Sequence, residues 1–200
     1  MNSLIFVRHS IPEIDPEIPS DMWPLSRDGE YAAHELARRL GKYAPRHIIS
    51  SPELKALGTA NILSAHLDCM VGIEADLREH ERRQVGFMPS AVFAAQIARF
   101  LQSSSEVTFG DECADEVYTR FSQTIKRVLS QYHDENIVVV THGTALSLYL
   151  GRLCQIDALE LWQSLQLPDA FSLPASLVSA SYTKEFPECG RKLARTLQRI

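Results

Sequence analysis

Short apolar runs alternate along the chain with stretches in which apolar residues recur every three or four positions. The runs 3–7, 47–50 and 137–141 have the apolar character of strands that are buried on both faces of a sheet. Helical spacing marks the stretches Ala33–Leu40, Ala56–Leu67, Phe93–Leu101, Val117–Tyr132 and Leu146–Leu153. This alternation predicts an α/β fold in which helices pack in layers around a mostly parallel sheet.

Capping residues and prolines indicate where several of these elements begin. Ser26 is expected to cap the first helix, and Ser51 with Pro52 is expected to open the second. A proline-rich loop over residues 12–24 separates the first strand from the first helix. Val, Ala and Tyr alternate with serine over residues 178–182, which predicts a last strand that is antiparallel or at an edge.

The composition is that of an ordinary globular protein. Of the 200 residues, 45% are hydrophobic and 22% are charged, which excludes a disordered or fibrous chain and suits one domain over residues 1–200. The formal net charge of −5 disfavours nucleic acid and anionic membranes as partners. Any site for an anion must therefore depend on a local cluster of positive charge.

Cysteine usage and the N-terminus bear on the cellular compartment. The cysteines at 69, 113, 154 and 189 lie far apart and lack the spacing of a metal site, so we expect them to be reduced. The first apolar run is too short for a signal peptide, and no stretch of about 18 apolar residues predicts a membrane span. These features lead us to expect a cytoplasmic protein.

Polar residues with the chemistry of an anion site follow three of the predicted strands. Arg8-His9-Ser10 follows the first, Ser50-Ser51-Pro52 with Lys55 follows the second, and Thr141-His142-Gly143-Thr144 follows the third. Because the carboxyl ends of parallel strands meet at one edge of a sheet, we expect these side chains to form a compact positive pocket. Helix N-termini beside the pocket add unpaired N–H groups, which favour a phosphate.

In this order and at these separations, the motifs resemble those of the histidine phosphatase superfamily, the phosphoglycerate mutase-like proteins. The resemblance covers nearly the whole chain and rests on Val7-Arg8-His9, Pro24-Leu25-Ser26-x-x-Gly29, Ser50-Ser51-Pro52-x-x-Lys55-Ala56-x-x-Thr59-Ala60, Leu77-x-Glu79 and Val140-Thr141-His142-Gly143. It implies a three-layer α/β/α sandwich around a mostly parallel sheet. It also implies that residues 1–200 form a single histidine phosphatase domain.

The resemblance further implies a role for each residue of the predicted pocket. His9 would be the nucleophile that becomes phosphohistidine, and Glu79 would protonate the leaving group and then activate water. Arg8, Lys55 and His142 would bind the phosphate, and His142 would also stabilise charge in the transition state. Neither a metal nor a cofactor is implied.

Several features of the sequence leave parts of this site open. Ser10 stands where the family usually has glycine, and Lys55 stands where it usually has a second arginine, so an altered phosphate pocket is expected. Glu81 is an alternative to Glu79 as the acid. The positive charges of Arg78, Arg82 and Arg83 can belong to a run of charged residues exposed to solvent. Alternatively, they can select a substrate that has a second anionic group.

The function predicted from these residues is metal-independent hydrolysis of a phosphomonoester through a phosphohistidine on His9. One alternative is a mutase of the phosphoglycerate type, and another is a catalytically weakened module that binds a phosphorylated partner. The expected partner is a small phosphorylated metabolite or another phosphomonoester, selected by the loops 11–24 and 82–89. The sequence does not indicate the oligomeric state.

Overall fold

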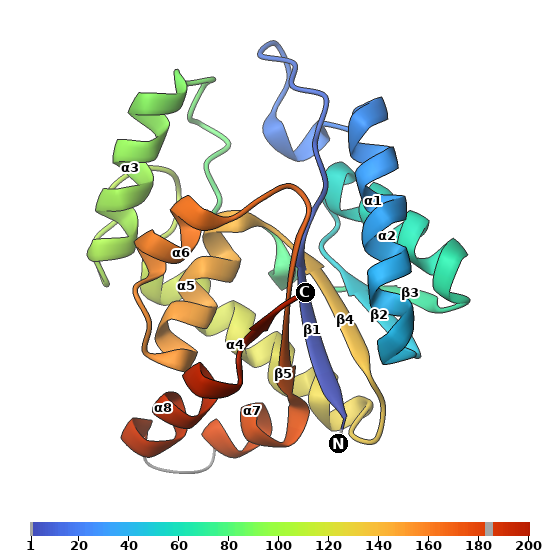
Figure 1. The fold of residues 1–200 in the computed structure, drawn as a ribbon. Coiled ribbons are helices and arrows are strands. Elements are labelled where there is room, and N and C mark those ends of the chain that lie inside the picture. Colours follow the sequence, from blue (N-terminus) through green and yellow to red (C-terminus); the bar gives the residue numbers. More distant parts are fainter. Residues whose placement is uncertain (1, 183–185) are drawn as a thin grey trace.

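The computed structural model describes residues 2–182 and 186–200, and a six-stranded mixed sheet forms its centre (Figure 1). The strands are β1 (Ser3–Arg8), β2 (His47–Ser50), β3 (Met70–Ile73), β4 (Ile137–Thr141), β5 (Asp169–Pro174) and β6 (Gln198–Arg199). They lie in the order β3-β2-β4-β1-β5-β6. Strands β1 to β4 are mutually parallel, whereas β5 runs antiparallel to β1 and β6 runs antiparallel to β5.

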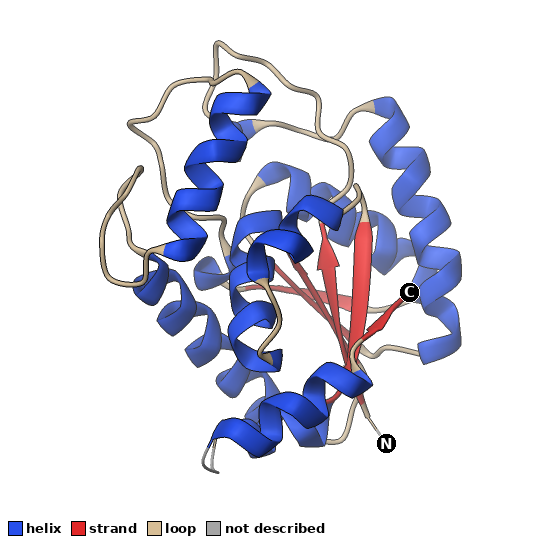
Figure 2. Cartoon of the chain, turned by 60° about the vertical axis from the view of Figure 1, so that its left-hand side comes forward, coloured by secondary structure: helices blue, strands red, loops and turns tan. Residues whose placement is uncertain are grey.

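Helices cover both faces of this sheet (Figures 1 and 2). They are α1 (Arg27–Leu40), α2 (Leu54–Leu67), α3 (Ser90–Gln102), α4 (Ala114–Gln131), α5 (Gly143–Cys154), α6 (Ala158–Ser164), α7 (Ala175–Ser181) and α8 (Phe186–Thr196). Helices α1 and α2 pack on one face, and α4, α5, α7 and α8 share the core on the other. The predicted three-layer α/β/α sandwich with a mostly parallel sheet is therefore confirmed.

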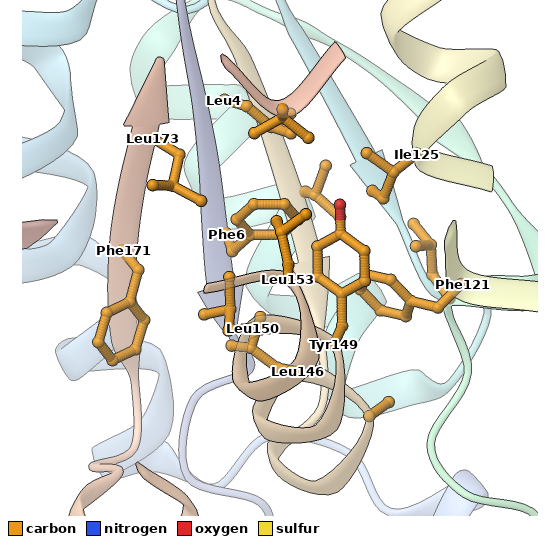
Figure 3. Close-up of a cluster of buried hydrophobic side chains, with 14 of the residues drawn as sticks. Leu4, Phe6, Phe121, Ile125, Leu146, Tyr149, Leu150, Leu153, Phe171 and Leu173 are labelled. Atoms are coloured by element: carbon orange, nitrogen blue, oxygen red, sulfur yellow. The ribbon is translucent and has the colours of Figure 1, made fainter. Parts of the chain in front are cut away.

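Side chains of β1 alternate between the two cores. Phe6 lies in the larger core, where its ring centroid is 5.4 Å from that of Tyr149 in α5, which is in turn 4.7 Å from Phe121 in α4 (Figure 3). Burial of each such side chain contributes roughly 1.5–3 kcal/mol to folding. Ile5, the next residue along the strand, packs instead with Leu36 of α1. These contacts hold β1 and α5 together, and both elements border the predicted pocket.

Two details of the predicted secondary structure are wrong. Residues 178–182 do not form a strand, because Val178 belongs to α7, whose buried residues Ala175, Val178 and Ser181 recur every three positions. Ala180 lies in the same helix and Tyr182 at its end, while β5 and β6 are the antiparallel strands. The second helix begins at Leu54, so Ser51 is not its cap. The Ser26 hydroxyl, in contrast, accepts the backbone N–H of Gly29 and caps α1 as predicted.

Two segments extend beyond the carboxyl ends of the parallel strands. The loop between β1 and α1 rises on one side of this edge, and α3 rises on the other (Figure 1). The predicted pocket therefore lies at the edge of the sheet from which both segments project. In the described part of the chain, no helix has the length and apolar character that a membrane span requires.

Candidate active site

The ends of two adjacent parallel strands bring His9 and His142 together. His9 follows β1 and donates its backbone N–H to the Thr141 carbonyl at the end of β4, 2.9 Å away. His142 is the next residue after Thr141, and the two imidazole centroids are 5.1 Å apart with an interplanar angle of 57°. Both side chains are buried. The predicted convergence of these histidines is confirmed.

The backbone fixes the protonation pattern of His9. Its Nδ1–H donates to the Ser10 carbonyl oxygen at 2.7 Å, which leaves Nε2 as the nitrogen with a free lone pair. Burial and the charges of His142, Lys55 and Arg8 hold the pKa of His9 well below its usual range. His9 is therefore a neutral imidazole near pH 7, with the geometry of a nitrogen nucleophile.

His142 has one nitrogen engaged and one without a partner. Its Nε2 shares a hydrogen bond of 2.7 Å with Ser51 Oγ and lies 3.4 Å from a carboxylate oxygen of Glu53. Its Nδ1 is buried and has no hydrogen-bond partner among the described residues. Burial outweighs the nearby carboxylates and lowers the pKa of His142 to about 4. A bound anion would satisfy Nδ1 and favour the charged form of the ring.

Arg8 supplies a second buried nitrogen atom without a hydrogen-bond partner, and this one is an N–H donor. Its Nη1 donates to the Leu165 carbonyl oxygen at 3.1 Å, which ties the guanidinium to the segment before β5. Its Nε is buried without a hydrogen-bond partner in the described chain. A Cβ at Gly143 would lie only 3.0 Å from this Nε, so the absence of a side chain there makes room for the guanidinium. Buried, unpaired N–H groups are costly, and a phosphoryl oxygen is the kind of acceptor that would satisfy them.

Lys55 lies in the first turn of α2, as predicted, but it already has an acidic partner. Its Nζ is 2.6 Å from a carboxylate oxygen of Glu53 and also donates to the Ser20 carbonyl oxygen at 2.6 Å. The same Glu53 carboxylate lies 3.4 Å from Nε2 of His142, and the Lys55 charge still lowers the pKa of both His9 and His142. The lysine therefore belongs to the site, with its charge largely balanced by Glu53.

Glu53 is the residue at this site that sequence reasoning missed. Besides Lys55 and His142, it contacts the backbone N–H of Glu79, which donates to it at 2.7 Å. Burial raises the pKa of this carboxyl, but the charges of His142 and Lys55 and two hydrogen bonds outweigh burial and keep the pKa below normal. An acidic residue two positions before the lysine was the available signal in the sequence. Its partners come from three other positions, however, and only the fold brings these together.

The two candidate acids lie in different surroundings. The Glu79 carboxylate accepts the backbone N–H groups of Thr144 and Ala145 at 2.9 Å each, so it sits against the N-terminus of α5 beside His142. Glu81 instead forms ion pairs of 3.4 Å with arginines on either side of it. Burial raises the pKa of Glu79, yet the charges of Arg82 and His142 and backbone hydrogen bonds hold it far below its usual range. The structure thus brings Glu79 to the histidines and keeps Glu81 among the arginines.

The three candidate cations near Glu79 also differ. Arg78 is paired with Asp76 at 3.0 Å and with Glu81, and Arg83 is exposed and also paired with Glu81. Arg82 is half-buried, with its guanidinium 4.9 Å from the Phe93 ring centroid in α3. Of the three arginines that could simply face solvent, only Arg83 is exposed.

Ser10 does not disturb the turn where the family usually has glycine. Its backbone N–H donates to Thr59 Oγ1 at 2.9 Å, and its hydroxyl donates to the Gly29 carbonyl oxygen in α1 at 2.7 Å. Both groups are buried. The non-glycine residues with positive φ in the described chain are Ala44, Asp68 and Gln155, so the Ser10 backbone needs no left-handed conformation.

The donor set of this site suits an oxyanion better than a metal ion. In the described residues, no group of three or more histidine, cysteine, aspartate or glutamate side chains is placed to hold a metal ion. The imidazoles of His9 and His142 lie 5.1 Å apart at the strand ends, the Arg8 guanidinium lies against Gly143 next to His142, and Arg8 always carries a positive charge. The arrangement can bind a tetrahedral anion next to a neutral imidazole.

Comparison with known proteins points in the same direction. A family model described as histidine phosphatase superfamily (branch 1) matches residues 4–190. Phosphoglycerate mutase-like protein 4 of Arabidopsis thaliana is 33% identical over 137 residues, which are 62% of this chain. The match spans 58% of that relative's length.

Solved structures share the fold at low sequence identity. Mycobacterial glucosyl-3-phosphoglycerate phosphatase has a TM-score of 0.66 at 21% identity, over 86% of this chain and 90% of that chain. Phosphoserine phosphatase from Entamoeba histolytica, in complex with 3-phosphoglyceric acid, has a TM-score of 0.71 at 20% identity, over 87% of this chain and 91% of that chain. With the family model covering most of its length, the chain belongs to the histidine phosphatase superfamily.

Proposed function

We propose that the protein hydrolyses a phosphomonoester through a phosphohistidine intermediate on His9, without a metal ion. The observation that carries this proposal is a neutral imidazole beside two buried nitrogen atoms that lack hydrogen-bond partners. Nδ1 of His9 is held by the Ser10 carbonyl, while Arg8 Nε and His142 Nδ1 have no partner among the described residues. Arg8 Nε–H, and His142 with a proton on Nδ1, would donate to phosphoryl oxygens and leave phosphorus open to Nε2 of His9.

In the first step, Nε2 of His9 attacks phosphorus while the bond from phosphorus to the leaving oxygen breaks. The leaving oxygen takes a proton from Glu79, so the products are phosphohistidine, a free alcohol and the Glu79 carboxylate. Glu79 is ionised in the free site because its pKa is lowered. The negative charge of a bound phosphoryl group raises that pKa again, and a substrate that binds as the monoanion brings the required proton with it.

In the second step, water attacks phosphorus and the bond from phosphorus to Nε2 breaks. Glu79 takes a proton from the attacking water, so the step releases inorganic phosphate and returns Glu79 protonated and His9 neutral. Backbone N–H donors from Thr144 and Ala145 stabilise the carboxylate between the two steps. Arg8, Lys55 and His142 would stabilise the charge on the phosphoryl oxygens throughout.

The substrate class we propose is a small phosphorylated metabolite. The net charge of −5 disfavours large polyanions. The structural neighbours include a glucosyl-3-phosphoglycerate phosphatase and a phosphoserine phosphatase, whose names describe small phosphorylated substrates. The four cysteines are free, which supports the expectation of a reducing compartment such as the cytoplasm.

A panel of phosphomonoesters tests this function. We expect release of inorganic phosphate from at least one small phosphorylated acid or sugar, at a rate that a chelator does not change. A parallel assay for positional isomers of a phosphoglycerate tests the mutase alternative, which predicts isomer formation in excess of phosphate release. Loss of activity on adding chelator would contradict the metal-independent mechanism.

The Glu53–Lys55 ion pair favours a second candidate function. Because Glu53 balances the charge of Lys55, the pocket has less positive charge for the transition state than an unpaired cation would give. A weakened module that binds a phosphorylated partner would bind inorganic phosphate but show no turnover across the panel. Calorimetric titration with phosphate, alongside the activity panel, separates the two functions.

A further inference from the structure

The segment that carries Glu79 has little regular structure of its own. A 3-10 turn, η3 (Ala75–Leu77), precedes it, and residues 78–89 form neither helix nor strand. Its backbone carbonyl groups therefore need partners from elsewhere in the fold. For two of these carbonyls, and for one in η3, the partner is one side chain, that of Arg120 in α4.

The Arg120 guanidinium holds this segment by its main chain. Nη1 donates to the carbonyl oxygens of Asp76 at 2.7 Å and Arg78 at 2.9 Å, and Nη2 donates to that of Glu79 at 2.9 Å. The side chain of Glu112 takes the other donors, Nε at 3.0 Å and Nη2 at 2.6 Å. These contacts use all of the roughly five N–H bonds that a guanidinium offers.

Glu112 holds the same segment from its other side. One of its carboxylate oxygens accepts the backbone N–H of Glu81 at 2.8 Å, and its carbonyl oxygen lies 3.1 Å from Nε2 of His80. His80 is buried and stacked on Phe100 of α3, with ring centroids 4.1 Å apart. The backbone on both sides of Glu79 is thus tied to the Arg120–Glu112 pair.

Arg120 and Glu112 do not bind substrate directly, because both are buried and the hydrogen-bond donors of Arg120 are all in use. The Arg120 residue is 9% exposed and Glu112 is 7% exposed. With every guanidinium hydrogen engaged inside the protein, Arg120 has none to offer a phosphate. The Glu79 side chain, in contrast, points from this tethered backbone to the N-terminus of α5.

We propose that Arg120 and Glu112 are positioning residues that set the place of Glu79 for proton transfer to the leaving group. This inference rests on the proposed role of Glu79 as proton donor. Movement of the main chain at Glu79 would carry the carboxyl away from the leaving oxygen, while His9, Arg8 and His142 stay in place on other elements. The loss should therefore depend on how much the leaving group needs a proton.

Substrates with different leaving groups test this inference. 4-Nitrophenyl phosphate releases an acidic phenol that needs little protonation, whereas an alkyl phosphate releases a basic alkoxide. We expect Arg120→Lys to lower kcat/KM for the alkyl phosphate at least about tenfold more than for 4-nitrophenyl phosphate, because general acid catalysis contributes roughly 10²–10⁴-fold. Lysine keeps the charge but lacks the planar fork that reaches several carbonyls.

Matched variants complete the experiment. Arg127→Lys is the control, since Arg127 lies on the same helix but pairs with side chains, among them Glu74 at 3.0 Å. This variant should leave kcat/KM for both substrates unchanged. Glu112→Gln, which keeps the shape but removes the charge, should reproduce the selective loss and replaces Arg120→Lys if that variant does not fold. An equal loss on both substrates, or no loss, would overturn the inference.

The reference variant Glu79→Gln separates this inference from the proposed function. If Glu79→Gln shows the selective loss and the Arg120 and Glu112 variants do not, the positioning role is wrong while the role of Glu79 stands. If Glu79→Gln itself lowers kcat/KM equally for both substrates, the proton-donor role of Glu79 is wrong, and the inference fails with it.

Discussion

The Lys55 ammonium lies 2.6 Å from the Glu53 carboxylate, and both side chains are about nine-tenths buried. An internal anion therefore accompanies the cation that stands in place of the family's usual arginine. The same carboxylate lies 3.4 Å from Nε2 of His142. Glu53 would stabilise a charged His142 when an anion binds, but it also repels that anion.

The repulsion leads to a prediction for Glu53→Gln. Glutamine keeps the shape and the acceptor oxygen, and it removes one negative charge beside the pocket. We expect the inhibition constant of inorganic phosphate to fall about fivefold, which corresponds to a modest Coulomb term at the effective dielectric constant of a partly buried site. Glu35→Gln, at an exposed position in α1, makes the same change in net charge and should leave phosphate inhibition unchanged. Weaker phosphate binding in Glu53→Gln would show that Glu53 acts chiefly by holding Lys55 and His142 in place.

Gly143→Ala should weaken phosphate binding without destabilising the protein. The added Cβ would lie 3.0 Å from Nε and 3.2 Å from Cζ of Arg8, so the guanidinium must shift by a few tenths of an ångström. Alanine also favours the helix that Gly143 begins, by roughly 0.5–1 kcal/mol. We expect KM for a phosphomonoester to rise about tenfold, as for the loss of one charged hydrogen bond, with an unchanged or higher melting temperature.

A matched glycine provides the control for that variant. A Cβ at Gly41 would meet its nearest neighbour, Leu67 Cδ2, at 4.0 Å, which is an ordinary contact. Gly41→Ala should therefore change neither KM nor kcat. If Gly143→Ala binds phosphate as well as the unmodified protein does, Arg8 Nε is not a phosphate ligand.

The pH dependence of activity follows from the lowered pKa of His9. The nucleophile must be neutral, and burial with nearby positive charge keeps its pKa well below the ordinary value of 6.5. The acid limb of kcat/KM should therefore lie below pH 6.5. Because the Lys55 charge contributes to this shift, Lys55→Gln should move the limb to higher pH, whatever its effect on the maximal rate. An acid limb that does not move in Lys55→Gln would contradict this electrostatic coupling.

The protein should become less stable as pH is lowered through a range set by His142. Its pKa is about 4 in the folded protein against 6.5 for an ordinary histidine, so the unfolded chain binds the proton first. The free energy of unfolding should decrease as pH falls through this range, by an amount on the order of 3 kcal/mol from His142. Glu79, whose pKa is also lowered from 4.5, adds to the loss only below about that pH.

Denaturant unfolding at a series of pH values measures this effect. His142→Asn removes the titrating group, so the slope of stability against pH should become smaller between pH 6.5 and about 4. The slope that remains would come from His9 and His80, whose pKa values burial also lowers. An unchanged slope in His142→Asn would mean that His142 does not titrate in this range.

Elements with strong periodicity could be predicted from the sequence, and those without it could not. The buried strand Ile137–Thr141 and the amphipathic helix over 114–131 have patterns that only one structure satisfies. The edge strand β3 was missed because Met70 and Ile73 are exposed, so its apolar residues follow no buried face. In α7, the small residues alternate in a way that resembles a strand, with a period of two. The buried side chains instead recur every three positions, as in a helix.

At the site, too, some residues could be predicted from the sequence and others could not. His9 and His142 follow strands directly, and Lys55 lies in the first turn of the helix after β2, so knowing the sheet was enough to predict that they meet. Glu53 and the Arg120–Glu112 pair act through contacts with distant backbone groups, such as the N–H and the carbonyl oxygen of Glu79. Such contacts leave no local pattern, and they become visible only when the tertiary structure is known.

Rapid chemical quenching of the protein with a radiolabelled phosphomonoester would reveal the covalent intermediate itself. We predict label that is stable in base and lost in acid, located on His9 by peptide mapping, and absent from His9→Ala. That variant should also lose at least about a thousandfold in turnover, as expected for removal of a nucleophile, while it still binds inorganic phosphate. Label on another residue, or full turnover in His9→Ala, would contradict the assignment of His9 as the nucleophile.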